Sequence, residues 1–272
     1  MFGRSRIEYK TFDQILVMRR AGLVVAEALE AVRDAARPGV TTAELDAVGE
    51  RVIRGHGATP SFLGYHGFPA SLCLSVNSEI VHGIPGRRAL EPGDLLSVDC
   101  GAIVDGWHGD SAISLVVDGV DGDREDDRLV EATERAMWAG IAALQVGGWL
   151  GDVGAAIEDD VDGAYAIVEG YVGHGIGTAM HQPPEVLNYR TRERGPRLKA
   201  GLCVAVEPML VRGSSDTRVL DDDWTVVTCD DSRAAHWEHS VALTDDGLWV
   251  LTAPDGGTAG LAPHGIVPTP LA

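Results

Sequence analysis

Residues 95–117, LLSVDCGAIVDGWHGDSAISLVV, consist of two β-rich runs that meet at Asp105-Gly106. Asp-Gly is among the dipeptides most favoured in two-residue hairpin turns, because these turns need residues that tolerate a positive φ. We therefore predict an antiparallel hairpin in which Val104 faces Trp107 across the turn.

The register of this hairpin places two carboxylates on one face. With Val104 opposite Trp107, Asp99 lies opposite Ala112, and Asp110 is two residues away on that same strand. Diagonal neighbours in a hairpin lie roughly 7–8 Å apart at the backbone, with their side chains closer. This spacing suits carboxylates that converge on two metal ions about 3.5–4 Å apart. The alternative is a hairpin with solvated aspartates, and the pair alone does not decide between the two.

Two further carboxylates interrupt apolar, strand-like runs. Glu207 follows the run in GLCVAVEPML (201–210), and Glu238 opens the run in HWEHSVALT (236–244). A buried carboxylate needs a cation or several donors to offset its lost hydration. Four such groups would repel one another strongly, whereas two divalent ions balance four negative charges. We therefore predict a hydrolytic dinuclear metal centre, with the carboxylates Asp99, Asp110, Glu207 and Glu238 among its ligands.

His174 is the fifth candidate ligand. It lies in GYVGHGIGT (170–178), where closely spaced glycines let the backbone approach a ligand or another segment. The segment lacks the phosphate-loop pattern and the strand, turn and helix context of a dinucleotide site, so nucleotide binding is disfavoured. A lone histidine is also commonly a core residue, and the assignment of His174 therefore depends on the carboxylates around it.

Composition sets the broad class of the protein. The 272 residues, 45% of them hydrophobic, suffice for one large α/β domain, and the net charge of −19 opposes binding to nucleic acid or anionic lipid. Acidic runs at 121–123 and 221–223 are expected in solvated loops. The N-terminus has no apolar signal region and no segment reaches the roughly 18 apolar residues of a membrane span, so we expect a cytoplasmic protein. The cysteines lack CxxC spacing and are expected to be reduced structural thiols: Cys73, Cys100, Cys203 and Cys229.

The chain contains a faint internal duplication. LEPGDLLSVD (90–99) resembles LKAGLCVAVE (198–207), and each copy ends in a candidate ligand. HGIP (82–85) precedes the first copy, as HGIG (174–177) precedes the second. A site on a pseudo-twofold axis would draw ligands from both halves. Chance similarity of amphipathic segments is the alternative explanation.

Helical apolar spacing predicts two helices before each copy, at 11–36 and 41–55 and at 124–145 and 150–168. Thr11-x-x-Gln14 and Thr41-x-x-Glu44 are capping boxes that mark two of the helix starts. We therefore predict an α/β (α+β) fold with two related αα-plus-strand halves in a single domain, residues 11–252, after an N-terminal segment, residues 1–10. Residues 253–272 are rich in glycine, proline and alanine, which predicts an irregular tail with a solvated His264.

Six segments resemble type I methionine aminopeptidases in order and spacing, over about residues 10–252. They are PSFLGYHGFPASLCLSVN (60–77), VHGIP (81–85), SVDCGAIVDGWHGD (97–110), GHGIGTAMHQPPEVLNY (173–189), VEPML (206–210) and WEHS (237–240). The metal motifs are shared with prolidases and aminopeptidase P of the same superfamily. GYHG, Cys73, Trp224 and the chain length favour type I. The resemblance implies the pita-bread fold, a curved and mainly antiparallel sheet covered by helices.

The resemblance also implies roles for the candidate residues. Asp99 would bind one metal, His174 and Glu207 the other, and Asp110 and Glu238 both. Glu207 would also shuttle a proton, His181 would stabilise the transition state, and His82 would contact the scissile amide. This ligand set suits Mn²⁺, Fe²⁺, Co²⁺ or Zn²⁺. His66 and His239 are unassigned, and His56, His108 and His236 are interpreted as structural or surface groups.

A methionine pocket is implied in the same way. Its residues would be Phe62, Tyr65, Phe68, Cys73, Met180 and Trp224, which without the resemblance would be read as core packing. Two of them depart from the family pattern, in which Phe68 is commonly tyrosine and Met180 commonly phenylalanine. AAHWEHS (234–240) lacks a serine that is frequent in the family, which puts its auxiliary monovalent-cation site in doubt.

The implied function is removal of the initiator methionine from nascent polypeptides whose second residue is small. We expect a monomer that acts on nascent N-termini, with the ribosome as a candidate partner and no nucleic-acid or membrane site. The alternatives are a prolidase-like peptidase that cleaves before proline and a non-catalytic binding protein of the same fold.

Overall fold

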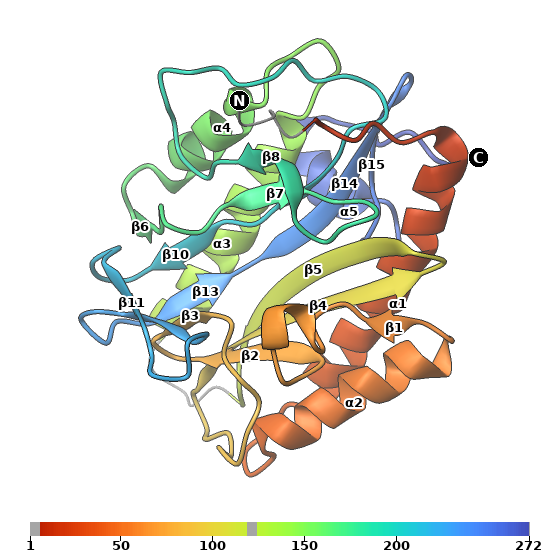
Figure 1. The fold of residues 1–272 in the computed structure, drawn as a ribbon. Coiled ribbons are helices and arrows are strands. Elements are labelled where there is room, and N and C mark those ends of the chain that lie inside the picture. Colours follow the sequence, from red (N-terminus) through yellow and green to blue (C-terminus); the bar gives the residue numbers. More distant parts are fainter. Residues whose placement is uncertain (1–5, 119–123, 272) are drawn as a thin grey trace, which may run out of the picture.

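The computed structural model describes residues 6–118 and 124–271 (Figure 1). Residues 1–5 of the predicted N-terminal segment and the acidic run at 121–123 lie outside this description, whereas residues 221–223 are exposed as expected. The helices are α1 (Phe12–Ala35), α2 (Thr42–Gly55), α3 (Glu125–Ala142), α4 (Gly151–Val161) and α5 (Thr258–Leu261), with the 3-10 turns η1 (Tyr65–Gly67) and η2 (Ala262–His264). The strands are β1 (Thr59–Pro60), β2 (Leu72–Val76), β3 (Glu79–Val81), β4 (Leu95–Val104), β5 (Trp107–Val116), β6 (Ala166–Ile167), β7 (Gly173–Gly175), β8 (Gln182–Val186), β9 (Cys203–Val206), β10 (Met209–Val211), β11 (Thr217–Val219), β12 (Val226–Thr228), β13 (Ala234–His236), β14 (Glu238–Thr244) and β15 (Gly247–Val250).

The largest sheet within these ranges has nine strands. Seven follow the order β1-β4-β5-β14-β9-β7-β8, while β2 pairs with β4 and β15 with β14. All of these pairings are antiparallel. Two three-stranded sheets, β13-β10-β6 and β11-β12-β3, extend one end of the molecule. The predicted mixed fold with a mainly antiparallel sheet is confirmed.

The β4-β5 hairpin has the predicted register. Val104 pairs with Trp107, and Asp99 pairs with Ala112. Asp105 and Gly106 have φ values of 49° and 81°, which are the left-handed values that the favoured two-residue turn requires. The turn residues therefore fix which strand positions share a face.

The two halves of the chain meet where β5 pairs with β14. β4 flanks this pair on one side and β9 on the other, and these two strands carry the two copies of the duplicated segment. The symmetric order β4-β5-β14-β9 agrees with the predicted duplication. A side chain near this junction can therefore meet side chains from both halves.

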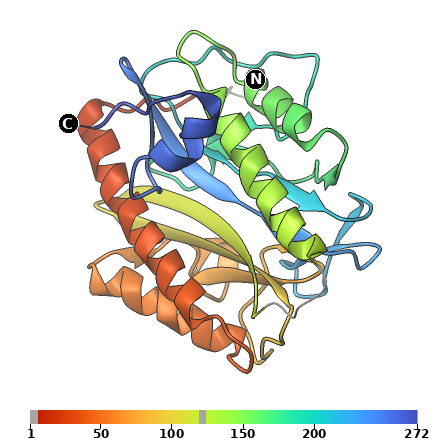
Figure 2. The ribbon, with the colours of Figure 1, turned by 180° about the vertical axis from the view of Figure 1, so that it is seen from behind.

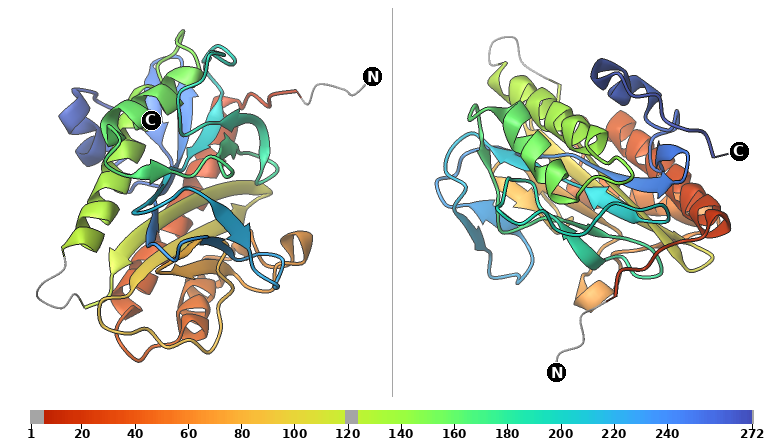
Figure 3. Two further views of the ribbon diagram at one scale, coloured as in Figure 1. Left: turned by 90° about the vertical axis from the view of Figure 1, so that its left-hand side faces the viewer. Right: turned by 90° about the horizontal axis from the view of Figure 1, so that it is seen from above.

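The helices cover the back of the sheet. α1 packs against β4 and β5, and α3 packs against β9, β13 and β14 (Figure 2). α2 lies against α1, and α4 lies against α3, so each half has one inner and one outer helix (Figure 3). Thr11 and Thr41 form both predicted capping boxes.

The prediction that the fourth helix extends to residue 168 is wrong, because α4 ends at Val161. Asp162 and Gly163 follow it with φ values of 47° and 72°, and left-handed residues of this kind end a helix. The Asp-Gly pair carried this signal in the sequence.

The prediction of an irregular tail after residue 252 is also wrong in part. Residues 258–264 form α5 and η2, and Leu261 is fully buried in the main hydrophobic core. α5 packs against α3. His264 is exposed, as expected. The C-terminal segment therefore closes the core behind the second half.

The cysteines and the apolar character of the helices were also predicted from the sequence. All four cysteines are free, and Cys73, Cys100 and Cys203 are buried in β2, β4 and β9. Among the described residues, no helix combines the length and the apolar character that crossing a membrane would require.

Candidate metal centre

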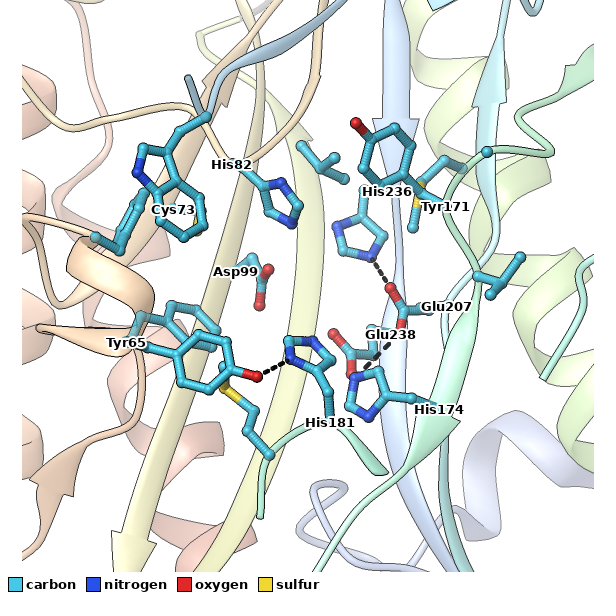
Figure 4. A pocket seen from close by; sticks show the side chains of 18 residues that line it. Tyr65, Cys73, His82, Asp99, Tyr171, His174, His181, Glu207, His236 and Glu238 are labelled. Carbon is cyan, nitrogen blue, oxygen red and sulfur yellow. Dashed lines mark hydrogen bonds and ion pairs between the residues drawn. The ribbon is translucent and has the colours of Figure 1, made fainter. Parts of the chain in front are cut away.

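The predicted ligand side chains come from both halves and meet at the β5-β14 junction. Asp99 lies on β4, Asp110 on β5 and His174 on β7, while Glu207 directly follows β9 and Glu238 begins β14. Figure 4 shows Asp99, His174, Glu207 and Glu238 pointing toward one another across a shared cavity. The structure therefore brings together carboxylates from distant parts of the sequence, such as Asp99 and Glu238.

Strand register explains this convergence. Asp99 and Glu238 both pair with Ala112, one from each neighbouring strand, so the three residues form a row across β4, β5 and β14. Asp110, two residues from Ala112, shares its face. The small side chain of Ala112 leaves the space between the two carboxylates open.

Two serines hold β5 and β14 together at this point. The Ser240 hydroxyl donates to the Asp110 carbonyl at 2.7 Å and accepts from the Asp110 N–H at 3.2 Å. The Ser111 hydroxyl donates to the Glu238 carbonyl at 2.5 Å. These bonds fix the backbone of Asp110 and Glu238, which limits how far either side chain can move from the centre.

The side-chain atoms are spaced as metal ligands would be. One ligand atom from each of Asp110, His174 and Glu238 lies within 4.8 Å of the other two, and the same holds for Glu207, His236 and Glu238. His174 Nε2 is 3.3 Å from Glu207 Oε1. Ligands on a common ion, each about 2.0–2.2 Å from it, are separated by such distances.

The buried carboxylate oxygens have the character of cation ligands. Each of the four carboxylates has a buried oxygen without a hydrogen-bond partner among the described residues: Asp99 Oδ1, Asp110 Oδ1, Glu207 Oε1 and Glu238 Oε1. Unpaired buried oxygens are rare and costly in folded proteins. Divalent cations would satisfy all four, so the residues present fit the metal centre that the sequence predicts.

The electrostatics agree with this interpretation. Burial raises the pKa of Asp99 to about 7. Burial, followed by repulsion from the neighbouring carboxylates, raises the pKa of Asp110, Glu207 and Glu238 well above the usual range. Burial and mutual repulsion therefore disfavour the ionised form of these carboxylates, and a bound cation would favour it.

His174 is prepared to act as a neutral ligand. Burial lowers its pKa to about 3. Its Nδ1 lies 3.0 Å from the Gly175 carbonyl oxygen, which favours the tautomer that leaves Nε2 free to bind. A Cβ on Gly173 would collide with the Ala205 carbonyl oxygen, and one on Gly175 with the Pro183 carbonyl oxygen. The glycines around His174 therefore serve close packing of strands and not a phosphate group.

His82 and His181 line the same cavity as the carboxylates. His181 Nδ1 lies 3.0 Å from the Tyr65 hydroxyl, and its ring packs 4.2 Å from that of His174. The His82 ring packs edge-on against Trp224 and Tyr171. Burial, followed by repulsion from His181, lowers the pKa of His82 to about 4.

An apolar pocket adjoins the carboxylates. Phe62, Phe68, Cys73 and Met180 form a separate hydrophobic cluster with Ala70, against which Tyr65, Ile84 and Trp224 pack. The cavity that this cluster shares with Asp99, Glu207 and Glu238 has a volume of about 270 Å³. All six residues predicted for a substrate pocket thus lie together beside the candidate metal centre.

His236, which the sequence led us to interpret as a structural or surface group, lies at the candidate metal centre. The side chain is 2% exposed and lines the cavity, with Nε2 3.8 Å from Glu207 Oε2 (Figure 4). His236 precedes Glu238 by two residues, and the alternation of a strand would have predicted that both share a face. His108 and His239 have hydrogen-bond partners outside the carboxylate cluster: His108 bonds Ser61, and His239 bonds Ser111 and Thr252.

Contacts of the N-terminal segment near the cavity were not predicted from the sequence. The Glu8 carboxylate accepts hydrogen bonds from the Thr178 N–H and hydroxyl at 3.2 and 3.0 Å and from the Gln182 amide at 2.7 Å. These donors flank Met180 and His181. The N-terminal segment therefore holds the loop that brings both residues to the cavity.

The fold and the site together define a class. The chain belongs to metallopeptidase family M24, whose model matches residues 17–245. It is 52% identical over 258 residues to Methionine aminopeptidase 1 of Mycobacterium tuberculosis, which covers 92% of this chain and 96% of that protein. The crystal structure of methionine aminopeptidase from Rickettsia prowazekii matches with a TM-score of 0.88 at 39% identity, over 91% of this chain and 100% of that chain. Prolidase from Pyrococcus furiosus, at 20% identity and a TM-score of 0.71 over 90% of this chain and 65% of that chain, shares the fold alone.

Proposed function

We propose that this metallopeptidase is a methionine aminopeptidase that removes the N-terminal methionine of newly made polypeptides when the second residue is small. The observation that carries the proposal is the contact between an apolar, sulfur-containing pocket and a cluster of unpaired buried carboxylates. Relatives named as methionine aminopeptidases, matched over almost their whole length, support it.

The proposed metal ligands are Asp99, Asp110, His174, Glu207 and Glu238. Two divalent ions would neutralise the four carboxylates and, when bound, would polarise the scissile carbonyl and lower the pKa of water. Four carboxylates with an imidazole suit Mn²⁺, Fe²⁺, Co²⁺ and Zn²⁺ alike, so the ion is left open.

The chain's own residues supply the proton transfers and the orientation of the substrate. Glu207 lies within the cavity, where it can accept a proton from water and pass it to the leaving amine. His181, whose Nδ1 lies 3.0 Å from the Tyr65 hydroxyl, would donate to the oxygen of the scissile carbonyl as negative charge develops there. His82, which lies on the other side of Asp99 from His181 in Figure 4, would bond the scissile amide.

The apolar cluster would bind the methionine side chain. Phe62 and Phe68 offer aromatic surfaces, while Cys73 and Met180 offer soft sulfur contacts that suit an unbranched thioether. Phe68 and Trp224 pack edge to face with their centroids 5.1 Å apart, which closes one side of the pocket. A β-branched or charged first residue would not fill this pocket without a clash or an unpaired charge.

The test is cleavage of a peptide panel by protein loaded with Mn²⁺ or Co²⁺. Met-Ala peptides should be cleaved, Met-Phe peptides should be cleaved at least about 100-fold more slowly, and Leu-Ala peptides should resist. The matched control is the Glu207→Gln variant, in which cleavage should fall by about 10²–10⁴-fold.

Three outcomes would contradict the proposal. Equal cleavage of Met-Ala and Met-Phe would refute selection for a small second residue. Cleavage of Xaa-Pro in preference to Met-Ala would indicate a prolidase-like peptidase. An absence of stoichiometric, chelator-sensitive metal together with an absence of cleavage would indicate a binding protein.

A further inference from the structure

His236 is a buried imidazole whose Nε2 faces Glu207 but has no hydrogen-bond partner among the described residues. It ends β13 and is 2% exposed, and its Nε2 is fully buried without a hydrogen bond to any described residue. A buried ring nitrogen without a partner is costly. The position of His236 therefore needs an explanation beyond packing.

The backbone of His236 is held in place. The Ser114 hydroxyl donates to the His236 carbonyl at 2.8 Å and accepts from the His236 N–H at 2.9 Å. Ser114 in turn bonds Ser97 on β4 at 2.8 Å, so β13 is tied to the first hairpin. This anchoring directs the ring toward Glu207, as Figure 4 shows.

Glu207 lies between two imidazoles. Its Oε1 faces His174 Nε2 at 3.3 Å, and its Oε2 faces His236 Nε2 at 3.8 Å. The second distance is too long for a hydrogen bond, but it is compatible with two ligands that share an ion. The two carboxylate oxygens of Glu207 could thus bind ions at two adjacent positions.

The two groups of ligand atoms share one carboxylate. Asp110, His174 and Glu238 form one group, and Glu207, His236 and Glu238 form the other. Each group contains one imidazole, and Glu238 belongs to both, as a bridging carboxylate would. The ligand set taken from the family resemblance contains one histidine, whereas this geometry contains two.

We propose that His236 is a metal-binding residue of this protein, with Nε2 as a ligand in a position that Glu207 and Glu238 complete. The inference rests on one part of the proposed function, which is that the centre binds divalent ions. It does not require cleavage of N-terminal methionine. An added imidazole favours borderline ions such as Co²⁺ and Zn²⁺ over Mn²⁺. The rival explanation is that His236 only orients Glu207 and binds no ion.

The experiment is proton NMR of the full chain loaded with Co²⁺. A histidine bound through Nε2 gives a strongly shifted Nδ1–H resonance that disappears in D₂O, so these resonances count the bound imidazoles. We expect two in the unsubstituted protein, one of which is absent in His236→Gln. His82→Gln is the matched control, because His82 lines the same cavity but belongs to neither ligand group, and it should retain both.

A second measurement uses equilibrium dialysis on the same proteins. His236→Gln should lose at least about tenfold in Co²⁺ affinity at one position, with a smaller loss for Mn²⁺. An equal loss for both ions would favour the orienting role.

The outcomes separate the inference from the proposed function. A single shifted resonance in the unsubstituted protein, retained in His236→Gln, would overturn the inference and leave the proposed function intact. Two resonances without cleavage of Met-Ala would support the inference and refute the proposed activity. No bound Co²⁺ would overturn both. The count in the unsubstituted protein decides the question even if the variant fails to fold.

Discussion

In the metal-free protein, the free energy of unfolding should decrease as the pH rises. The ionisation of Asp99 should account for a measurable part of this decrease. The pKa of Asp99 is raised from 3.8 to about 7 by burial. A difference of about three pKa units corresponds to about 4 kcal/mol, at 1.36 kcal/mol per unit. Because the folded-state pKa is raised, this stability is present below the unfolded-state pKa and is lost as the pH rises through about 7.

The perturbation is Asp99→Asn in the chelator-treated protein. Asparagine has a similar shape and does not ionise in this range, so its contribution does not change with pH. Between pH 5 and pH 7.5, the unsubstituted protein should lose roughly 2–3 kcal/mol relative to Asp99→Asn. The lowered pKa values of His174 and His236 act in the opposite direction below about pH 6.5. The two histidines are common to both proteins and cancel in the difference. Asp99→Asn also removes the repulsion by which Asp99 raises the pKa of Asp110, Glu207 and Glu238, and this adds to the difference.

The assay is urea unfolding at several pH values, with the free energy of unfolding compared between the two metal-free proteins. The difference should grow as the pH rises and should become independent of pH below the unfolded-state pKa of 3.8, where Asp99 is protonated in both the folded and the unfolded states. Addition of Mn²⁺ or Co²⁺ should restore stability to the unsubstituted protein, because the ionised carboxylate then has a partner. A difference that stays constant between pH 5 and pH 7.5 would refute the argument that Asp99 is buried without a cation.

Two further substitutions test how the site is built. Ala112→Leu should fill the space between Asp99 and Glu238 and lower the metal affinity, measured by dialysis, by at least about tenfold. Its control is Ile113→Val on the opposite face of the sheet, which should cost about 0.5–1.5 kcal/mol of stability yet bind metal normally. Unchanged metal affinity in Ala112→Leu would contradict the argument that strand register brings the two carboxylates together. Glu8→Ala removes the hydrogen bond from Gln182, and a charge-assisted hydrogen bond contributes about 1.5–3 kcal/mol. The loop at residues 177–182 should therefore show faster amide hydrogen exchange, and kcat/KM for Met-Ala should fall about tenfold. Glu30→Ala, which removes only an exposed ion pair with Arg33, is its control, and equal exchange in the two variants would show that Glu8 does not hold the loop.

The sequence predicted those features that depend on local rules. Asp105-Gly106 fixed the hairpin register and with it the shared face of Asp99 and Asp110. Thr11 and Thr41 identified two helix starts through their side-chain caps. The duplicated segments predicted that β4 and β9 would occupy related places, although the direct contact of the halves through β5 and β14 came only from the structure.

The features that the sequence did not predict depend on contacts between distant segments or on short local signals. Glu8 meets Gln182 across 174 positions, and no spacing rule connects them. The tail lacks a periodic pattern because α5 is a single short turn held by the burial of Leu261. The position of His236 could have been predicted from the sequence. Residues two apart in an extended chain share a face, so His236 and Glu238 face the same side, as Asp110 and Ala112 do. A single buried histidine offered no reason to prefer a ligand over a core residue until Glu207 was seen beside it.

The most direct test of the central claim is a count of metal ions per chain. After chelation, the protein should be dialysed against Mn²⁺ or Co²⁺ and analysed for bound metal, beside the variants Asp110→Asn and Glu238→Gln. If the buried carboxylates of both halves surround a pair of cations, the unsubstituted protein binds two ions per chain and releases protons as they enter, and each variant binds fewer. Binding of no chelator-sensitive metal, or unchanged binding in both variants, would contradict the account.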